Sequence, residues 1–593
     1  MNWLQELQDS GIWLLKSLVL SGIFFALGLY ILAKTTRWGH QFWLLARDYI
    51  SPRKNLQPLI FFLVILFFNL FAVRLSVLFS NWYNAMYSAL QEMKIDVFWQ
   101  QMLIFSVLAS IHIANVLFTY YLEKRFTINW WIWLNHQLLD KWVDKQAYYK
   151  THFLKEKIDN PDQRIQQDIN SFVNSSLGFA TGVVSSVTSI VAFTIILWDL
   201  SGPMPVFGVE VPRAMVFLVF AYVLITSVFA FKIGRPLRVL NFANERLNAN
   251  YRYGLIRLSE YAESIAFYRG ERAEKASLRQ QFSQVISNFW AIVFRSLKLS
   301  GFNLLVSQAA VVFPFLIQAS RFFSKQITLG DLMQTNQAFG RVQSALSFFR
   351  NSYDDFTAYR AVLDRLTGFH TGVTAANQPV QVEITHNHSQ QVHFDNVSVS
   401  TPDGRLLIEN LSFQLNAGDS LLIKGQSGLG KTTLLRAAAG LWAQAEGKID
   451  YSANNLFLSQ RPYLPQGSLL DALYYPQPVP EQADHAQLAE IMRSVQLGHL
   501  VDKLAEVHQW SKTLSLGEQQ RLAFARVLLQ KPDVVFLDEA SASLDEGLEE
   551  AMYRLLRQQL PQLIMLSVGH RSSLTAYHNK QLLLEKDLRW DFS

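Results

Sequence analysis

The sequence contains no cysteine among its 593 residues. This absence excludes disulfide bonds, thiolate metal ligands and thiol redox chemistry. Charged residues are scarce too, at 17% of the chain, against roughly 25% in soluble proteins. Residues 1–10 lack the basic segment that opens a secretory signal and carry Glu6 and Asp9 instead, so we expect no cleaved signal peptide.

What the chain has in excess is apolar sequence, since 50% of its residues are hydrophobic. They form long runs at 11–33, 59–80, 98–121, 172–198, 211–233, 289–317 and, in a more polar form, 327–349. Each run has the ~20 residues that cross a hydrocarbon core. One such run could be a buried helix of a soluble protein, but this series predicts an all-α membrane domain. It would have six core helices and one extra N-terminal helix, although the run alone leaves open whether that first helix crosses fully.

Basic residues predict how this domain is oriented. They gather in segments 34–57, 122–171 and 234–288, whereas 199–210 has none and 81–97 has only Lys94. Because Lys and Arg accumulate on the cytoplasmic side, we place these three segments and the C-terminal half in the cytoplasm. The formal net charge of +6 is then a matter of membrane topology, and we expect no nucleic-acid partner.

Two apolar runs carry polar stripes at helical spacing. In the fourth run these are Ser171, Asn174, Gly178, Thr181, Ser185 and Thr188, with Ser175 and Ser189 beside them; in the seventh they are Gln334, Gln337, Arg341 and Ser344. Small polar residues on one helix face can form a close-packed seam. They can also line a water-filled cavity, an interpretation that the charge of Arg341 favours.

The composition changes between residues 366 and 390, where glycine, proline and polar residues lack apolar periodicity. We therefore predict a linker there, with His386 and His388 on its surface. The predicted domains are an N-terminal helix with its connector (1–57), the six-helix membrane domain (58–365), the linker (366–390) and an α/β domain (391–593). Short β-type runs separated by helical stretches indicate the α/β class.

The α/β domain contains a phosphate-binding loop, Gly425-Gln426-Ser427-Gly428-Leu429-Gly430-Lys431-Thr432-Thr433. An apolar strand precedes it and a helical stretch follows it, which is the context that a P-loop requires. Its backbone N–H groups and the helix N-terminus would hold the phosphates of ATP. Lys431 would reach the β- and γ-phosphates, and the Thr432 hydroxyl would bind Mg²⁺.

Two further positions follow apolar strands of the same domain. Asp538 and Glu539 end the run Val534 to Leu537, and His570 follows the run 563–568. Strand ends of this kind meet the phosphates in α/β folds. We assign Asp538 to Mg²⁺, Glu539 to general-base activation of water, and His570 to contact with the γ-phosphate and that water.

The segment Leu514-Ser515-Leu516-Gly517-Glu518-Gln519-Gln520-Arg521 resembles the signature motif of ATP-binding cassette (ABC) proteins. Residues 541–545 resemble their D-loop, Gln460 their Q-loop glutamine, and 567–570 their switch-histidine segment. The resemblance implies that Gln460 contributes to catalysis and to the Mg²⁺ site. It also implies that Ser515, Gly517 and Glu518 close over ATP held by a second cassette, so the chain would be a half-transporter that works as a homodimer.

The resemblance extends to a subgroup. Residues 440–442, 460–463 and 401–402 resemble the peroxisomal fatty-acyl subfamily, and 160–165 and 263–270 resemble SbmA/BacA-like transporters. Within this group the sequence resembles the bacterial YddA type, which implies a multi-pass protein of exporter-like topology in the bacterial inner membrane, surrounded by lipid. The segments 160–165 and 263–270 would lie near the coupling helices that dock on the cassettes.

Three positions depart from the common patterns of the family. Leu516 replaces a signature glycine, Glu518 replaces a glutamine, and Thr401 replaces the aromatic residue that stacks on adenine. Phe394 and Tyr463 are the aromatic residues that we consider as substitutes for it.

We expect an ATP-driven pump for a hydrophilic cargo such as a peptide or a cobalamin-like molecule, in a direction that the sequence leaves open. The alternative is an exporter or flippase of lipid-like or fatty-acyl compounds. An ATP-gated channel in the same fold is a further alternative, whereas a soluble ABC protein disagrees with the membrane runs.

Overall fold

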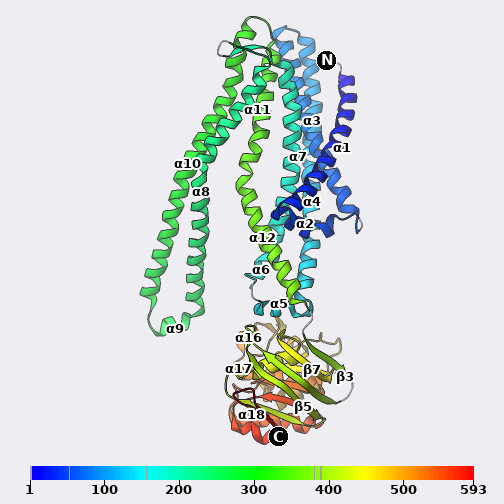
Figure 1. Ribbon diagram of the computed structural model, residues 1–593, viewed down its shortest axis with the longest axis vertical. Helices are drawn as coiled ribbons and strands as arrows, with labels where there is room; N and C mark the ends of the chain where they lie inside the picture. The colour runs from blue at the N-terminus through cyan, green and yellow to red at the C-terminus, as the bar shows by residue number, and fades with distance from the viewer. Residues whose placement is uncertain (1–2, 53, 155–157, 207–208, 379–380, 388–389) are drawn as a thin grey trace. The chain divides into compact units, whose positions relative to one another are not determined.

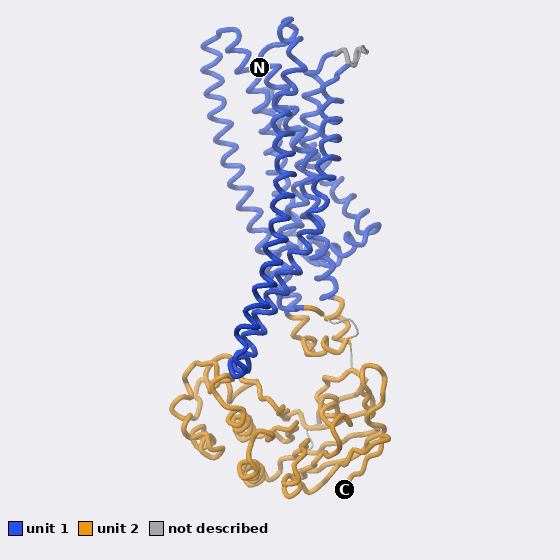
Figure 2. The backbone as a smooth tube through the Cα atoms, turned by 90° about the vertical axis from the view of Figure 1, so that its left-hand side faces the viewer, with its two compact units in different colours: residues 1–139, 160–370 blue, residues 140–159, 371–593 orange. Residues whose placement is uncertain are grey.

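The chain folds into two units, residues 1–139 with 160–370 and residues 140–159 with 371–593 (Figure 2). The structure is a computed structural model and describes residues 3–52, 54–154, 158–206, 209–378, 381–387 and 390–593. Each unit has its own buried core, so each is described by itself.

Long helices make up the first unit. They are α1 (Trp3–Thr35), α3 (Gln57–Gln91), α4 (Ile95–Val143), α7 (Ile169–Leu200), α8 (Ala214–Glu260), α10 (Glu271–Phe323) and α11 (Leu329–Asn351). Shorter elements join them: α2 (Arg37–Ile50), α6 (Pro161–Gln163), the π-helical turn η3 (Arg164–Asp168), strands β1 (Met204–Val206) and β2 (Val209–Val211), α9 (Ala262–Phe267) and α12 (Tyr353–Ala376). Within the described residues, α1, α3, α4, α7, α8 and α10 are long and apolar enough to cross a membrane. This confirms the predicted helical membrane domain, and the more polar seventh run forms α11.

Three helices are much longer than a membrane crossing requires. Helices α4, α8 and α10 have 49, 47 and 53 residues, where ~20 would cross the hydrocarbon core. Helices α8 and α10 lie side by side as a long hairpin with α9 at its turn (Figure 1). The basic segment 234–288 is therefore the helical end of this hairpin.

The core of the first unit forms where α7, α8 and α11 meet. Ala338, Phe339 and Val342 of α11 are completely buried, and they pack with Phe193 of α7 and Val219 of α8. Their spacing of one and then three residues puts the three α11 side chains on one helix face. Apolar residues of this face therefore bury α11 despite its polar composition.

The polar stripes divide between a packed seam and an exposed face. Gln334 is buried, donates to Asn81 Oδ1 of α3 at 2.9 Å and accepts from Asn84 Nδ2 at 2.7 Å. Thr181 is also buried, with its hydroxyl bonded to the Leu177 carbonyl at 3.0 Å. Of the two interpretations, Gln334 and Thr181 agree with the packed seam, because both use their polar atoms within the helix bundle. Other stripe residues, among them Asn174, Arg341 and Ser344, are exposed in the chain.

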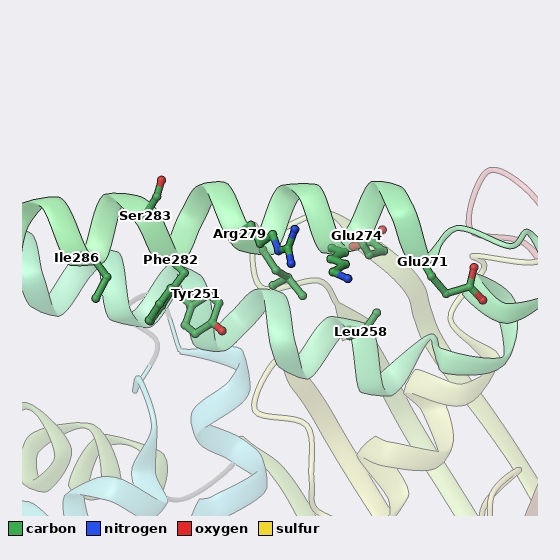
Figure 3. A pocket seen from close by; sticks show the side chains of 10 residues that line it. Tyr251, Leu258, Glu271, Glu274, Arg279, Phe282, Ser283 and Ile286 are labelled. Atoms are coloured by element: carbon green, nitrogen blue, oxygen red, sulfur yellow. The ribbon is translucent and has the colours of Figure 1, made fainter.

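A groove of about 700 Å³ runs along the α8–α10 hairpin near α9 (Figure 3). Tyr251 and Leu258 line it from α8, and Glu274, Leu278 and Phe282 are among its α10 residues. It contains none of the residues predicted to bind nucleotide.

Two sheets form the second unit. The larger has the order β14-β13-β6-β12-β11-β8, parallel except for the pairing of β13 (Lys580–Leu584) with β14 (Trp590–Phe592). Its other strands are β6 (Ser420–Gly425), β8 (Asn455–Leu458), β11 (Val534–Asp538) and β12 (Ile564–Val568). The smaller sheet has the order β3-β7-β4-β5, with β3 (Val382–Asn387), β4 (Gln391–Ser400), β5 (Leu406–Asn416) and β7 (Ala445–Ser452). A short third pair joins β9 (Gly467–Ser468) and β10 (Val507–His508).

The second unit also contains helices. They are α13 (Lys431–Ala438), α14 (Leu469–Tyr474), α15 (His485–Ser494), α16 (Trp510–Thr513), α17 (Leu516–Gln530) and α18 (Glu546–Gln559), with the 3-10 helices η4 (Gly498–Lys503) and η5 (Ser572–Tyr577). Along β11, Val535 and Leu537 enter one apolar cluster, and Val534 and Phe536 enter the other. Because successive side chains of a strand point to opposite faces, a strand covered on both faces needs a continuous apolar run.

The segment predicted as a linker, 366–390, is mostly regular structure. Helix α12 continues to Ala376, and β3 pairs in parallel with β7. In β3 the apolar Val382 and Ile384 alternate with polar neighbours, which is the period-two pattern of a strand. The pattern is too short to predict a strand in a segment that is otherwise rich in glycine, proline and polar residues. His386 lies in this strand with its ring 4.9 Å from that of Tyr451, whereas His388 lies outside the described residues.

A short helical segment from the first half of the sequence belongs to the second unit. It comprises η1 (Asp144–Gln146), α5 (Ala147–Lys150) and η2 (Thr151–Phe153). The Phe153 ring contacts the Trp442 ring edge-on at 4.8 Å, and Trp442 Nε1 donates to the Ser400 carbonyl at 2.8 Å. Trp442 therefore holds this segment against strand β4.

Candidate nucleotide-binding site

The loop 425–430 has a backbone that only glycine allows at its key positions. Gly425 and Gly430 have φ of 144° and 94°, values that residues with a Cβ rarely adopt. A Cβ on Gly425 would also lie 2.5 Å from the Leu584 carbonyl oxygen. The loop joins β6 directly to α13, so its N–H groups and the positive end of the helix dipole face the same space.

Lys431 is buried at the base of this loop. Its ammonium donates to the Gly425 carbonyl at 2.8 Å and to the Gln426 carbonyl at 2.9 Å. Burial lowers the pKa of Lys431, and the nearby Glu539 and Asp538 carboxylates oppose that change. A buried cation beside the loop and at the start of a helix is suited to an anion with several charges.

Thr432 and Asp538 join the loop to the end of β11. The Thr432 hydroxyl donates to Asp538 Oδ1 at 2.9 Å. Burial raises the pKa of Asp538, partly offset by the hydrogen bond from Thr432. A hydroxyl and a carboxylate oxygen in contact, with the Gln460 side chain near the adjoining Glu539, are a donor set that fits Mg²⁺, which prefers oxygen ligands.

Glu539 is held by two side chains from neighbouring strands. Gln460 Nε2 donates to Glu539 Oε2 at 2.9 Å, and His570 Nε2 lies 3.3 Å from Glu539 Oε1. Glu539 has a φ of 51°, which is uncommon for a residue with a side chain and is found at functional sites. The parallel strands β8, β11 and β12 thus bring Gln460, Glu539 and His570 together at their carboxyl ends.

The signature-like residues belong to a different cluster. Ser515 caps α17: its hydroxyl donates to Glu518 Oε2 at 2.7 Å, and its N–H does so at 2.9 Å. The other carboxylate oxygen of Glu518 lies 3.1 Å from His499 Nε2. The hydrogen bond from Ser515 and, more weakly, the contact with His499 lower the pKa of Glu518.

Gly517 lies against the D-loop, because a Cβ there would be 3.3 Å from the Ser543 carbonyl oxygen. Among the residues that the structure describes, no hydrogen bond joins Ser515, Gly517 or Glu518 to the loop 425–433. One copy therefore presents the P-loop cluster and the signature cluster as separate sites.

The residue in place of the adenine-stacking aromatic has a local role. Thr401 closes the turn 401–405: its N–H donates to the Arg405 carbonyl at 2.8 Å, and its hydroxyl oxygen accepts from the Arg405 N–H at 3.1 Å. Phe394 is fully buried and stacks on Phe413 at 4.5 Å, so it cannot contact a base. Tyr463 is 61% exposed, with its ring 5.2 Å from that of Tyr475.

Sequence reasoning missed two side chains that link these clusters. Gln520 lies inside the signature-like motif but was assigned no role, and Arg571 directly follows the predicted His570. Gln520 donates to the Gln460 carbonyl, and Arg571 donates to the Leu544 carbonyl of the D-loop. Only their position inside or beside a motif could have marked them.

Fold and site together define the class: a P-loop ATPase cassette joined in one chain to an α-helical membrane domain. Residues 45–323 match the family described as ABC transporter transmembrane region 2, and residues 408–542 match the family described as ABC transporter.

Full-length relatives agree with these matches. The chain is 55% identical to an "Uncharacterized ABC transporter ATP-binding protein" of Haemophilus influenzae, over 100% of both chains. It is 32% identical to the inner membrane ABC transporter ATP-binding protein YddA of Escherichia coli, over 89% of this chain and 94% of the relative. It is 26% identical to mouse ATP-binding cassette sub-family D member 3, over 77% of this chain and 74% of the relative.

The chain belongs to the ABC transporter family. It carries one membrane domain and one cassette, so it is a half-transporter whose ATPase is coupled to transport. Both parts of the sequence-based assignment, the ABC family and its group with YddA and the sub-family D proteins, are confirmed.

Proposed function

We propose that the protein is an ATP-driven transporter of the bacterial inner membrane that works as a homodimer. The observation that carries the proposal is the separation of the two clusters. Lys431, Thr432 and Glu539 gather around the P-loop, whereas Ser515 and Gly517 lie at the N-terminus of α17 and, in the described part of the chain, have no hydrogen bond to it. A second copy would bring its signature cluster to the γ-phosphate and complete each site.

The contacts around the P-loop support a role for these side chains in the hydrolysis of ATP. Lys431 and the loop N–H groups bind the phosphates, with Thr432, Asp538 and Gln460 as the oxygen ligands that would hold Mg²⁺. The ion neutralises charge on the β- and γ-phosphates when it is bound. Glu539 accepts the proton of the attacking water as general base, and His570 and Gln460 orient that carboxylate by contacting its two oxygens.

Two helical segments would connect the cassettes with the membrane helices. The segment 144–153 packs on its own cassette through Phe153 and Trp442. The turn at α9 exposes Phe267 and Tyr268, at 79% and 87%. Large exposed aromatic side chains mark interaction sites, and we assign α9 to the cassette of the second copy, in agreement with the resemblance of 263–270 to coupling segments.

The exposed polar side chains of the membrane helices favour a hydrophilic cargo, such as a peptide or a cobalamin-like molecule. Asn174 of α7 and Arg341 and Ser344 of α11 are exposed in one copy and would be expensive to expose to lipid. The resemblance of 440–442 and 460–463 to the peroxisomal fatty-acyl subfamily supports a lipid-like cargo as the second candidate. The name of YddA supports the inner membrane as the location, with the cassette in the cytoplasm.

The variant Glu539→Gln tests the ATPase part of the proposal. It keeps the shape and hydrogen bonds of the side chain but removes the base, so we expect ATP binding to persist and kcat to fall by about 10²-fold or more. Glu490→Gln, which changes an exposed glutamate of α15, is the matched control. Near-normal steady-state hydrolysis by Glu539→Gln would reject the assignment of the base.

Reconstitution in vesicles tests the cargo. ATPase stimulation is measured across panels of peptides, cobalamins and acyl lipids, and the stimulating compound is then followed in transport. Accumulation against a gradient supports a pump, and passive equilibration supports a channel. Stimulation by acyl lipids alone would replace the first candidate cargo with the second.

A further inference from the structure

The D-loop, residues 541–545, is bonded on both sides to the loops that carry Gln460 and His570. On one side the bond runs through Gln520 of α17, whose side chain is completely buried. Gln520 Nε2 donates to the Gln460 carbonyl at 2.9 Å, and Gln520 Oε1 accepts from the Ser543 N–H at 2.9 Å. One amide thus joins the signature helix, the Q-loop and the D-loop.

On the other side the bonds run through Glu549 of α18, which is 1% exposed. The Ser541 hydroxyl of the D-loop donates to Glu549 Oε1 at 2.6 Å, and the Ser573 hydroxyl donates to Glu549 Oε2 at 3.0 Å. Arg571 Nη1 lies 3.6 Å from the same oxygen.

Arg571 adds direct bonds to the D-loop backbone. It donates to the Leu544 carbonyl at 2.7 Å and to the Ala542 carbonyl at 3.2 Å. Arg571 directly follows His570, and Gln460 contacts Glu539. A displacement of the D-loop would therefore also displace Gln460 and His570, which contact the two carboxylate oxygens of Glu539.

These bonds are costly to break singly. A buried amide or carboxylate that loses one partner keeps its desolvation penalty without compensation. The D-loop, the Q-loop and the switch loop are therefore expected to move together, since any one of them moving alone would leave a buried polar group unpaired.

We propose that Gln520 and Glu549 are positioning residues that couple the D-loop to Gln460 and His570, so that nucleotide binding at the P-loop changes the conformation of the D-loop. Neither side chain contacts the reacting atoms. The inference rests on the proposed ATP hydrolysis. It adds the set of hydrogen bonds through which nucleotide binding at the P-loop would change the D-loop, which lies next to the signature motif.

The absence of cysteine allows a direct test in the full-length protein. A single Ala542→Cys substitution introduces the sole thiol of the chain, at an exposed D-loop position. The rate of maleimide labelling with and without Mg-ATP then measures how accessible the D-loop thiol is in each state. Steady-state kinetics measure kcat and KM.

Gln520→Met keeps the bulk of the side chain and removes both hydrogen bonds, and Gln520→Glu keeps the acceptor for Ser543 but removes the donor to Gln460. The matched control is Gln530→Met, which removes bonds from the same helix to the carbonyls of Tyr474 and Tyr475. For Gln520→Met we expect kcat to fall by about 10²-fold, the cost of roughly 1 Å of misplacement, with KM for ATP within about twofold. The effect of ATP on labelling of the thiol introduced by Ala542→Cys should disappear, whereas Gln530→Met keeps it.

Glu549→Gln provides a second, independent variant and should also abolish the labelling response. If Gln520→Met or Glu549→Gln lowers kcat but keeps the full labelling response, the residues are only structural and the proposal is overturned. Wild-type kcat in both variants overturns it as well. An Ala542→Cys protein that binds ATP, shows the labelling response and yet fails to hydrolyse ATP would contradict the proposed function and leave the coupling supported.

Discussion

His578 gives the cassette a stability that depends on pH. Its ring is buried between η5 and β12, with Nδ1 at 2.7 Å from the Leu574 carbonyl and Nε2 at 2.8 Å from the Ser567 hydroxyl. These contacts suit the neutral ring, because Nδ1–H donates and Nε2 accepts. Burial lowers the pKa of His578 from 6.5 to about 4, with smaller effects of Arg557 and Lys424 in the same direction.

The sign and size of the effect follow from this pKa. The unfolded chain binds a proton near pH 6.5 and the folded chain only near pH 4, so protonation favours unfolding between these values. The contribution of His578 is fully present above pH 6.5 and is lost as the pH falls towards 4. The full loss is about 3 kcal/mol, of which about 2 kcal/mol is lost at pH 5.

Hydrogen–deuterium exchange of the β12 amides in the full-length protein measures this loss. After correction for intrinsic exchange, the free energy of opening at pH 5 and pH 7 is compared between wild type and His578→Gln. We expect the decrease on acidification to be about 2 kcal/mol smaller in His578→Gln, and unchanged in the control His508→Gln, whose side chain is 56% exposed. The same pH dependence in wild type and His578→Gln would refute the reasoning.

Two further predictions concern contacts of the helical segments. Asp168→Asn should destabilise the first unit by about 3 kcal/mol, because the Asp168 carboxylate accepts two hydrogen bonds from Arg365, at 2.8 and 2.7 Å. Thermal unfolding in detergent measures this loss of stability, and an unchanged midpoint would contradict the prediction. Phe153→Ala removes the ring that packs on Trp442 and should leave ATP binding intact while it weakens the ATP-dependent change in labelling of a single Ser344→Cys. A full labelling response in that variant would exclude Phe153 from coupling.

The nucleotide-binding half of the fold could be predicted because its determinants are local. The P-loop follows a strand and opens a helix within a few residues, so glycine, lysine and threonine identify it without tertiary information. Gln460, Glu539 and His570 each follow an apolar strand, and parallel strands end at one edge of the sheet, so their meeting was also predictable. The contacts that orient Glu539 could not be predicted, because they depend on its positive φ, and that φ arises from the tertiary structure.

Contacts between segments distant in sequence could not be predicted. Nothing in the polar stripe of α11 distinguishes Gln334, which bonds to α3, from the uncharged Ser344, which is exposed. Nothing in the sequence of 144–153 indicates that it belongs to the cassette unit, where the Phe153 ring packs on the Trp442 ring. Helix periodicity identifies a face but not the partner that covers it.

The central claim is that the P-loop of one copy and the signature cluster of another form each ATP site. Lys431→Ala inactivates the first cluster, and Ser515→Arg inactivates the second. Each variant alone should lack ATPase activity. A mixed dimer purified through two different tags should regain it, because one site then combines an intact P-loop with an intact signature cluster. Full activity of Ser515→Arg alone, or no recovery in the mixed dimer, would contradict the claim.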